Sequence, residues 1–139
     1  MRHALLAGLT AALAACAPGL PVPVAIDTAA DVCAHCRMAI VSTATAAEIV
    51  ARGEEAVLFD DLGCLRDYVA HAGLPGDAMV VVADHRTGAW VDGRMAVFTK
   101  TSLDTPMGSG ILAHATIASR DLDAAAGGGT AMPVRSLLP

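Results

Sequence analysis

Two cysteines and a methionine lie close together in the sequence and indicate a site for a soft metal ion. The segment Asp31–Met38 reads Asp-Val-Cys-Ala-His-Cys-Arg-Met, so a thiol at Cys36 and a thioether at Met38 are two residues apart. On an extended segment, residues i and i+2 point to the same side. Soft sulfur ligands select Cu(I) above all, whereas a thioether suits zinc poorly.

Two other interpretations of this segment remain open. Cys33 and Cys36 could form a disulfide with Met38 in the core, or they could be a redox-active pair of the thioredoxin type. A redox pair normally opens a helix, whose N-terminus lowers the pKa of the thiol. The β-branched side chains that follow instead predict a strand over Arg37–Thr43, which counts against the redox interpretation.

A second methionine lies in a loop with unusual turn chemistry. The loop Asp104–Gly110 reads Asp-Thr-Pro-Met-Gly-Ser-Gly; its proline restricts φ and its glycines permit tight backbone geometry. A methionine displayed on such a loop is harder to explain by packing than one in a strand. Met107 is therefore a candidate third soft ligand, with a hydrophobic plug as the alternative.

The N-terminus carries the pattern of an exported lipoprotein. A short basic start and the apolar stretch Ala4–Ala15 precede Cys16, and Leu13–Cys16 reads Leu-Ala-Ala-Cys. This pattern predicts a signal peptide over residues 1–15 and lipidation of Cys16; an ordinary signal peptide is the alternative. Residues 16–30, which are rich in proline, would form a flexible tether on the periplasmic side of a bacterial membrane. Ala17 in place of aspartate favours the outer membrane, by similarity to enterobacterial lipoproteins.

Composition narrows the remaining possibilities. Once Cys16 is lipidated, three cysteines are left, and an odd number implies at least one free thiol or a metal ligand. The net charge of −5 and 3% aromatic residues argue against nucleic acid as a partner. After the signal stretch, no segment supplies the roughly 20 consecutive apolar residues that a spanning helix needs.

The hydrophobic pattern predicts an α+β fold in which strand, strand, helix and strand occur twice. The two ββαβ units would lie side by side in one domain, residues 31–139, with halves at about 31–85 and 86–139. The helix over Asp60–Ala72 would contain Cys64, which we interpret as a buried small thiol, and Asp60 or Asp61 would cap it. The other expected elements are strands over Glu48–Arg52, Ala56–Phe59, Ala78–Ala83, Val91–Lys100, Ser109–His114 and Ala131–Val134, and a helix over Ile117–Ala126.

In combination, four segments make the chain similar to a known family. Leu13–Cys16, Cys33–Met38, Phe59–Cys64 and Thr105–Gly110 together resemble, in the same order, the NosL family of lipoprotein copper chaperones. The chain departs from the usual family pattern at Arg37, where glycine is usual, and at His35, where an aromatic residue is common. The family fold resembles that of an organomercurial lyase.

The resemblance implies a membrane-anchored periplasmic chaperone that binds one Cu(I) ion. Its copper would go to the copper centres of nitrous oxide reductase, with the help of a membrane transporter complex. Carried over to this chain, the metal ligands would be Cys36, Met38 and Met107, with Cys33 less certain. Two histidines, His35 and His114, are additional candidates.

A second function of a different class is a thiol-dependent enzyme. A disulfide oxidoreductase, or a lyase acting on organomercurials, could use Cys33, Cys36 and an aspartate. Similarity of fold does not decide between these functions. Methionines at 38 and 107 favour metal binding, because a thiol enzyme has no need of thioethers.

Overall fold

The computed structural model describes residues 22–139. The predicted signal peptide, residues 1–15, and the predicted lipidation site Cys16 lie outside this range. Among the described residues, no helix is both long enough and apolar enough to cross a membrane.

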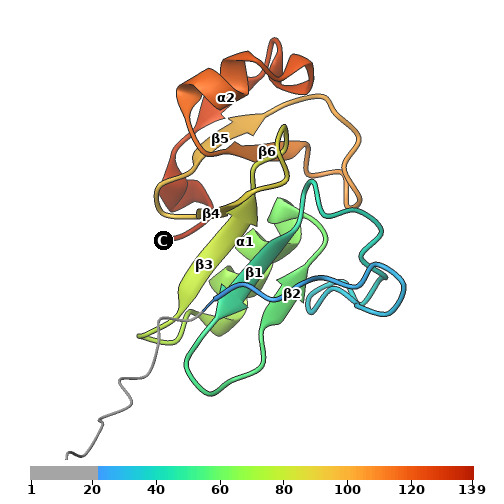
Figure 1. Ribbon diagram of the computed structural model, residues 1–139. Helices are drawn as coiled ribbons and strands as arrows, with labels where there is room; N and C mark the ends of the chain where they lie inside the picture. Colours follow the sequence, from blue (N-terminus) through green and yellow to red (C-terminus); the bar gives the residue numbers. More distant parts are fainter. Residues whose placement is uncertain (1–21) are drawn as a thin grey trace, which may run out of the picture.

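The first half of the domain is a four-stranded antiparallel sheet covered by one long helix. The sheet has the order β2-β1-β3-β4, and Ala47 at the start of β1 lies opposite Phe59 of β2 and Val82 of β3. Figure 1 shows this sheet in the lower part of the molecule, with α1 behind it. Its elements are β1 (Ala47–Val50), β2 (Val57–Phe59), α1 (Leu62–Ala72), β3 (Met79–Ala83) and β4 (Trp90–Asp92).

The second half repeats the same order of elements on a smaller scale. Its three-stranded sheet has the order β6-β5-β7, so the first strand of the unit is again central. The α+β class with two ββαβ units is therefore confirmed, and β4 extends the first sheet. The elements are β5 (Val97–Lys100), β6 (Ile111–His114), α2 (Ile117–Asp121), the 3-10 turn η1 (Ala124–Ala126), β7 (Thr130–Met132) and the 3-10 turn η2 (Val134–Ser136).

Two predicted elements are each divided by an aspartate. The strand expected over Val91–Lys100 is wrong as a single element, because a turn at Asp92 separates β4 from β5; its carboxylate accepts a hydrogen bond from the Arg94 backbone N–H at 2.8 Å. The helix expected over Ile117–Ala126 ends at Asp121. Asp123 then caps η1 by accepting from the Ala125 N–H at 2.9 Å. Both aspartates offer the backbone a local partner that competes with the regular ladder.

The strand predicted over Arg37–Thr43 is wrong. Arg37 has φ +67°, in the left-handed region, so the first residue of the predicted strand is not extended. The segment contributes only one isolated bridge, between Val32 and Ala39. The β-branched side chains Ile40, Val41 and Thr43 favour extended backbone, but they do not show whether a partner strand lies beside it.

One hydrophobic core serves both units. Phe59 and Leu65 from the first unit pack in the same cluster as Phe98 and Ile111 from the second, together with Leu137 near the C-terminus. Helix α1 contacts β1 and β2 of its own unit and β6 of the other. The start of α1 is therefore held where the two units meet, and this position determines the surroundings of Cys64.

Candidate metal centre

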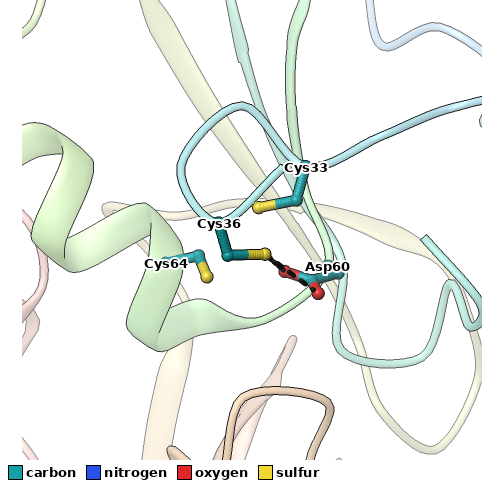
Figure 2. Close-up of side chains that lie close together, drawn as sticks. All are labelled: Cys33, Cys36, Asp60 and Cys64. Atoms are coloured by element: carbon teal, nitrogen blue, oxygen red, sulfur yellow. Dashed lines mark hydrogen bonds between the residues drawn. The ribbon is translucent and has the colours of Figure 1, made fainter. Parts of the chain in front are cut away.

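Three thiols and one carboxylate converge beside the start of α1. We call Cys33, Cys36, Asp60 and Cys64 the thiol cluster; each offers one atom, and these atoms all lie within 4.8 Å of one another. Figure 2 shows the cysteines of the turn facing Cys64 of α1, with Asp60 between β2 and α1. All three cysteines are free thiols, so the disulfide interpretation does not describe this structure.

A tight turn brings Cys33 and Cys36 together. The Cys33 N–H donates to the Met38 carbonyl at 2.8 Å, and the Arg37 N–H donates to the Cys33 carbonyl at 3.0 Å. The turn is fixed to the sheet because the Ala34 N–H donates to the carbonyl of Leu58 in β2 at 2.8 Å. Backbone bonds therefore set the spacing of the two thiols before any ion is bound.

Arg37 occupies the one position of this turn that favours glycine. Its φ of +67° costs a residue with a Cβ roughly 1–2 kcal/mol relative to the right-handed region. Glycine, which the resemblance noted in the sequence leads us to expect at this position, adopts this conformation freely. The departure at Arg37 thus leaves the turn intact and adds an exposed positive charge next to Cys36.

Burial keeps two of the thiols protonated in the metal-free protein. Desolvation raises the pKa of Cys33, which is 0% exposed. Desolvation, with an added contribution from neighbouring Cys33, raises the pKa of Cys64 well above the usual range. A soft cation would replace these protons, since a coordinating thiol is deprotonated by the metal.

Cys36 is the more accessible thiol and faces a carboxylate. Its Sγ lies 3.6 and 3.7 Å from the two oxygens of Asp60, to which it donates a weak hydrogen bond. Cys36 is half-buried, whereas Asp60 is buried. The cluster therefore has a closed side at Cys33 and Asp60 and an open side at Cys36.

Asp61 connects the Met107 loop to the start of α1. One of its carboxylate oxygens caps the helix by accepting from the Gly63 N–H at 2.6 Å. The other accepts from the Thr105 hydroxyl at 2.6 Å and from the Met107 N–H at 3.0 Å. Burial alone would raise the pKa of Asp61, but hydrogen bonds from Ser109, Thr105 and two backbone amides outweigh it and lower that pKa.

The Met107 loop borders a hollow that reaches the cluster. Cys64, Met107 and His35 line the same hollow of about 330 Å³, on the side of α1 that faces the loop. The Met107 side chain is 44% exposed, so it is not the buried plug that we considered as an alternative. Two candidate ligands, Met107 and His35, therefore share a surface with a thiol of the cluster.

The other two candidate ligands, Met38 and His114, do not line this hollow. Met38 is 55% exposed, and the expectation that it shares one side of an extended strand with Cys36 is wrong, because the turn at Arg37 intervenes. His114 is buried at the end of β6 and contacts Asp123 instead of a cysteine.

Two members of the thiol cluster were not among the predicted ligands. Asp60 was considered only as a helix cap, and Asp61 takes that role. Cys64 is buried, as expected, but it also faces the other two cysteines. The sequence signal that could have indicated Cys64 and Asp60 as ligands is a cysteine in the first turn of a helix that follows two aspartates. Nothing in the sequence, however, indicated that this turn packs against residues 33–36.

The donor set fits a soft cation. Three thiols offer polarizable sulfur, which suits Cu(I), while Asp60 is a harder ligand of the kind that zinc accepts. A metal ion bound through sulfur would face the carboxylate on the closed side of the cluster. Thioethers at the rim would extend the soft character toward solvent.

The fold of this chain is similar to that of one solved copper-chaperone structure. The chain matches the crystal structure of the copper chaperone NosL from Shewanella denitrificans with a TM-score of 0.65 and 19% sequence identity. The match covers 84% of this chain and 96% of the other. No family model and no curated protein sequence matches the chain. The likeness establishes a NosL-like fold for this chain.

Proposed function

We propose that this chain is a copper chaperone that binds one Cu(I) ion at the thiol cluster. The observation that carries the proposal is the convergence of three free thiols within 4.8 Å of one another in a fold shared with a copper chaperone. The odd number of thiols leaves at least one unpaired under any oxidation state. Such an arrangement suits a metal ligand better than a structural disulfide.

Cys36 is the central ligand in this proposal. It is the most accessible of the three thiols, and it lies beside both buried ones. Cys33 or Cys64 would supply a second thiolate, and Met107 a thioether from across the hollow. A rim of weaker thioether ligands supports transfer, because an incoming ligand from an acceptor can displace a thioether while a thiolate still holds the ion.

The resemblance to the NosL family supports a cellular location and a copper acceptor for this chain. We propose that the chain is held on the periplasmic side of a bacterial membrane by lipid on Cys16. It would deliver copper for the copper centres of nitrous oxide reductase, together with a membrane transporter complex. Buried acyl chains hold such a protein by about 0.8 kcal/mol per methylene group.

A competition titration with a chromogenic Cu(I) chelator tests the site. The reduced protein should bind one equivalent, and Cys36→Ala should abolish binding. Met107→Leu and Met38→Leu should each weaken binding, whereas Met95→Leu should not; Met95 is a matched control because its thioether is 75% exposed in the turn between β4 and β5. Unchanged Cu(I) affinity in Cys36→Ala would contradict the site assignment.

One contact favours a second candidate function. The thiol of Cys36 faces the Asp60 carboxylate beside two further thiols, a set of groups that a lyase acting on organomercurials could use. A thioredoxin-like mechanism has less support, because Cys33–Cys36 lies in a turn and not at a helix N-terminus. Release of hydrocarbon from an organomercurial, lost in both Cys36→Ala and Asp60→Asn, would favour the enzyme over the chaperone.

Membrane fractionation tests the proposed anchor. In a bacterial host, the full chain should enter the membrane fraction and incorporate labelled fatty acid, and Cys16→Ser should lose both properties. The matched variant Ala17→Asp, made in an enterobacterial host, should keep the lipid but move from the outer to the inner membrane. A Cys16→Ser chain that still incorporates label would refute the lipid site.

A further inference from the structure

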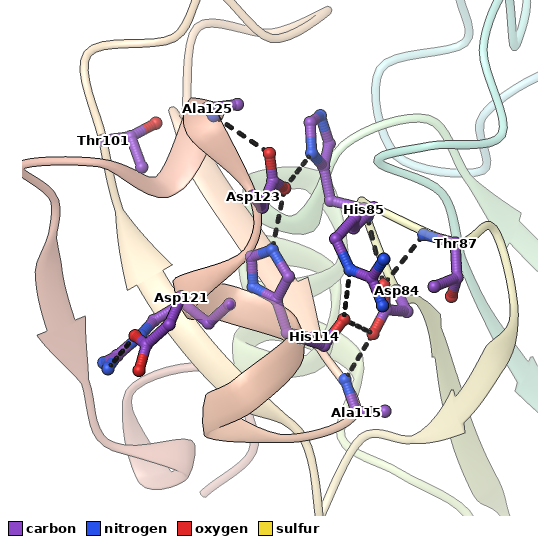
Figure 3. Close-up of polar contacts among 12 residues, drawn as sticks. Asp84, His85, Thr87, Thr101, His114, Ala115, Asp121, Asp123 and Ala125 are labelled. Atoms are coloured by element: carbon purple, nitrogen blue, oxygen red, sulfur yellow. Dashed lines mark hydrogen bonds and ion pairs between the residues drawn. The ribbon is translucent and has the colours of Figure 1, made fainter.

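A second set of metal-ligating side chains lies apart from the thiol cluster. His85 follows β3, His114 ends β6, and Asp123 precedes η1. Figure 3 shows both imidazoles directed at the carboxylate of Asp123. His85 Nδ1 lies 2.6 Å and His114 Nε2 lies 2.9 Å from the same oxygen, Oδ2. We call these three residues the histidine cluster.

The surrounding backbone holds the histidine cluster in place. The His85 N–H donates to the carbonyl of Ala113 in β6 at 2.9 Å. Asp84, next to His85, accepts from the Ala115 N–H at 2.7 Å and from the Ser119 hydroxyl at 2.8 Å. The other oxygen of Asp123 accepts from the Ala125 N–H at 2.9 Å. The connection after β3 and the segment from β6 to η1 therefore present two imidazole nitrogens and one carboxylate oxygen to one point.

His114 places an imidazole at the buried end of β6 with one of its nitrogens directed at Asp123. The side chain is 0% exposed, and among the described residues its Nδ1 has no hydrogen-bond partner. A buried polar atom without a partner costs free energy that an apolar side chain on β6 would avoid. Its other nitrogen points to Asp123 and His85, where a metal ion would take both the imidazole lone pairs and the carboxylate.

The cluster has a route to solvent. The side chains of His85 and Asp123 are 18% and 9% exposed. Asp123 also lines a hollow of about 410 Å³ together with Arg120 and Gly127–Gly129. An ion can therefore reach the carboxylate without unfolding of β6, and water can complete the coordination on the hollow side.

We propose that the histidine cluster binds a divalent transition metal ion of the zinc type through His85 Nδ1, His114 Nε2 and one oxygen of Asp123. Two imidazoles and a carboxylate are borderline ligands that suit Zn(II) and its neighbours, not the soft Cu(I) ion. Binding releases no net proton when both imidazoles are neutral: the ring proton of His85 then lies on Nε2, and that of His114 lies on the buried Nδ1, which has no partner among the described residues. This inference does not depend on copper at the thiol cluster.

The ion would join the two ββαβ units. His85 belongs to the connection after β3 of the first unit, whereas His114 and Asp123 belong to the second. Three ligands would thus fix the end of the first sheet to β6 and η1. A ligand that binds only the folded state raises its thermal stability, so the expected consequence is a more stable association of the units.

A thermal-shift titration of the full chain with Zn(II) tests this site. Zn(II) should raise the melting temperature of the wild-type chain and of Asp121→Asn, an exposed carboxylate two residues away that pairs with Arg120. The shift should be smaller in Asp123→Asn and His85→Ala, because only the thiol cluster is then left to bind Zn(II), with the affinity of the histidine cluster reduced at least about tenfold. Equal shifts in Asp123→Asn and the wild-type chain would overturn the proposal.

Co(II) separates the histidine cluster from the thiols. In Cys36→Ser, the chain should still bind Co(II) with d–d absorption and no thiolate-to-cobalt charge transfer, and Asp123→Asn should remove this signal. Detection of Co(II) only through thiolate charge transfer would refute the histidine site. Circular dichroism of each variant confirms that it folds, and the partly exposed His85 provides a variant that leaves the buried His114 in place.

Discussion

At the scale of single residues, Cys64 changes the chemistry of the site most. The first two thiols lie three residues apart in one turn, but Cys64 approaches them from a helix about thirty residues further along the chain. Its burial would be explained equally well by packing, since a free cysteine behaves as a small hydrophobic residue. Its distance to the other sulfurs supports a role in metal binding.

Cys64→Ala distinguishes these two roles. Alanine keeps a small apolar side chain, so a packing role predicts little change in Cu(I) affinity. A ligand role predicts affinity lower by about tenfold or more, comparable to the loss of an important supporting group at a metal site. Chelator competition measures the affinity, and urea unfolding of the metal-free chain measures any loss of stability separately. Unaltered affinity in a folded Cys64→Ala chain would leave Cys33 and Cys36 as the only thiol ligands.

At the scale of elements, one aspartate positions both the helix and the loop. Asp61 caps α1 and also accepts hydrogen bonds from Thr105 and Met107 in the second unit. The same carboxylate therefore helps to position the start of the helix that carries Cys64 and the backbone of Met107. In the sequence, Asp61 appeared only as a possible helix cap.

Asp61→Asn should destabilise the protein in a pH-dependent way. The pKa of Asp61 is lower in the folded protein than its unfolded value of 3.8. Its stabilisation is therefore fully present above pH 3.8 and is lost as the pH falls through the folded value. At neutral pH we expect a loss of about 1–3 kcal/mol, because the hydroxyl and amide donors lose a charged partner.

Urea unfolding at neutral pH and below pH 3.8 measures this difference. The gap between wild type and Asp61→Asn should narrow on acidification, whereas Asp77→Asn, an exposed aspartate before β3, should match the wild type at both pH values. A gap that stays constant with pH would mean that the charge of Asp61 does not contribute.

At the scale of the whole molecule, the two units are halves of one core. Leu137 and Leu138 at the C-terminal end are buried with residues of both sheets. A small domain depends strongly on each large buried side chain, because its core is limited. The C-terminal segment after η2 is therefore part of the domain that positions the metal centre, although it contributes no ligand to either cluster.

Leu137→Ala should cost about 2–5 kcal/mol, the usual loss for a buried leucine. Leu122→Ala is the matched control: Leu122 is exposed after α2, so its truncation should change stability by no more than about 0.5 kcal/mol. Denaturant unfolding of both variants measures the difference. Equal stability of the two variants would indicate that the C-terminal leucines do not belong to the cooperative core.

Features that depend on local pattern could be predicted from the order and spacing of residues. The repeated ββαβ order follows from the periodicity of apolar residues, and the soft character of the site follows from Cys33, Cys36 and the displayed Met107. Strand and helix ends were less predictable where an aspartate side chain competed for backbone hydrogen bonds, as at Asp92 and Asp123.

Only the tertiary structure decided which donors share one point in space. Cys64 and Asp60 join Cys33 and Cys36, and His114 meets His85 and Asp123. Cys64 is about thirty residues from Cys33 and Cys36, and His85 is 38 residues from Asp123. Their meeting depends on how α1 and β6 pack in the common core. Residue spacing carries no information about such contacts, because packing of the whole chain sets them.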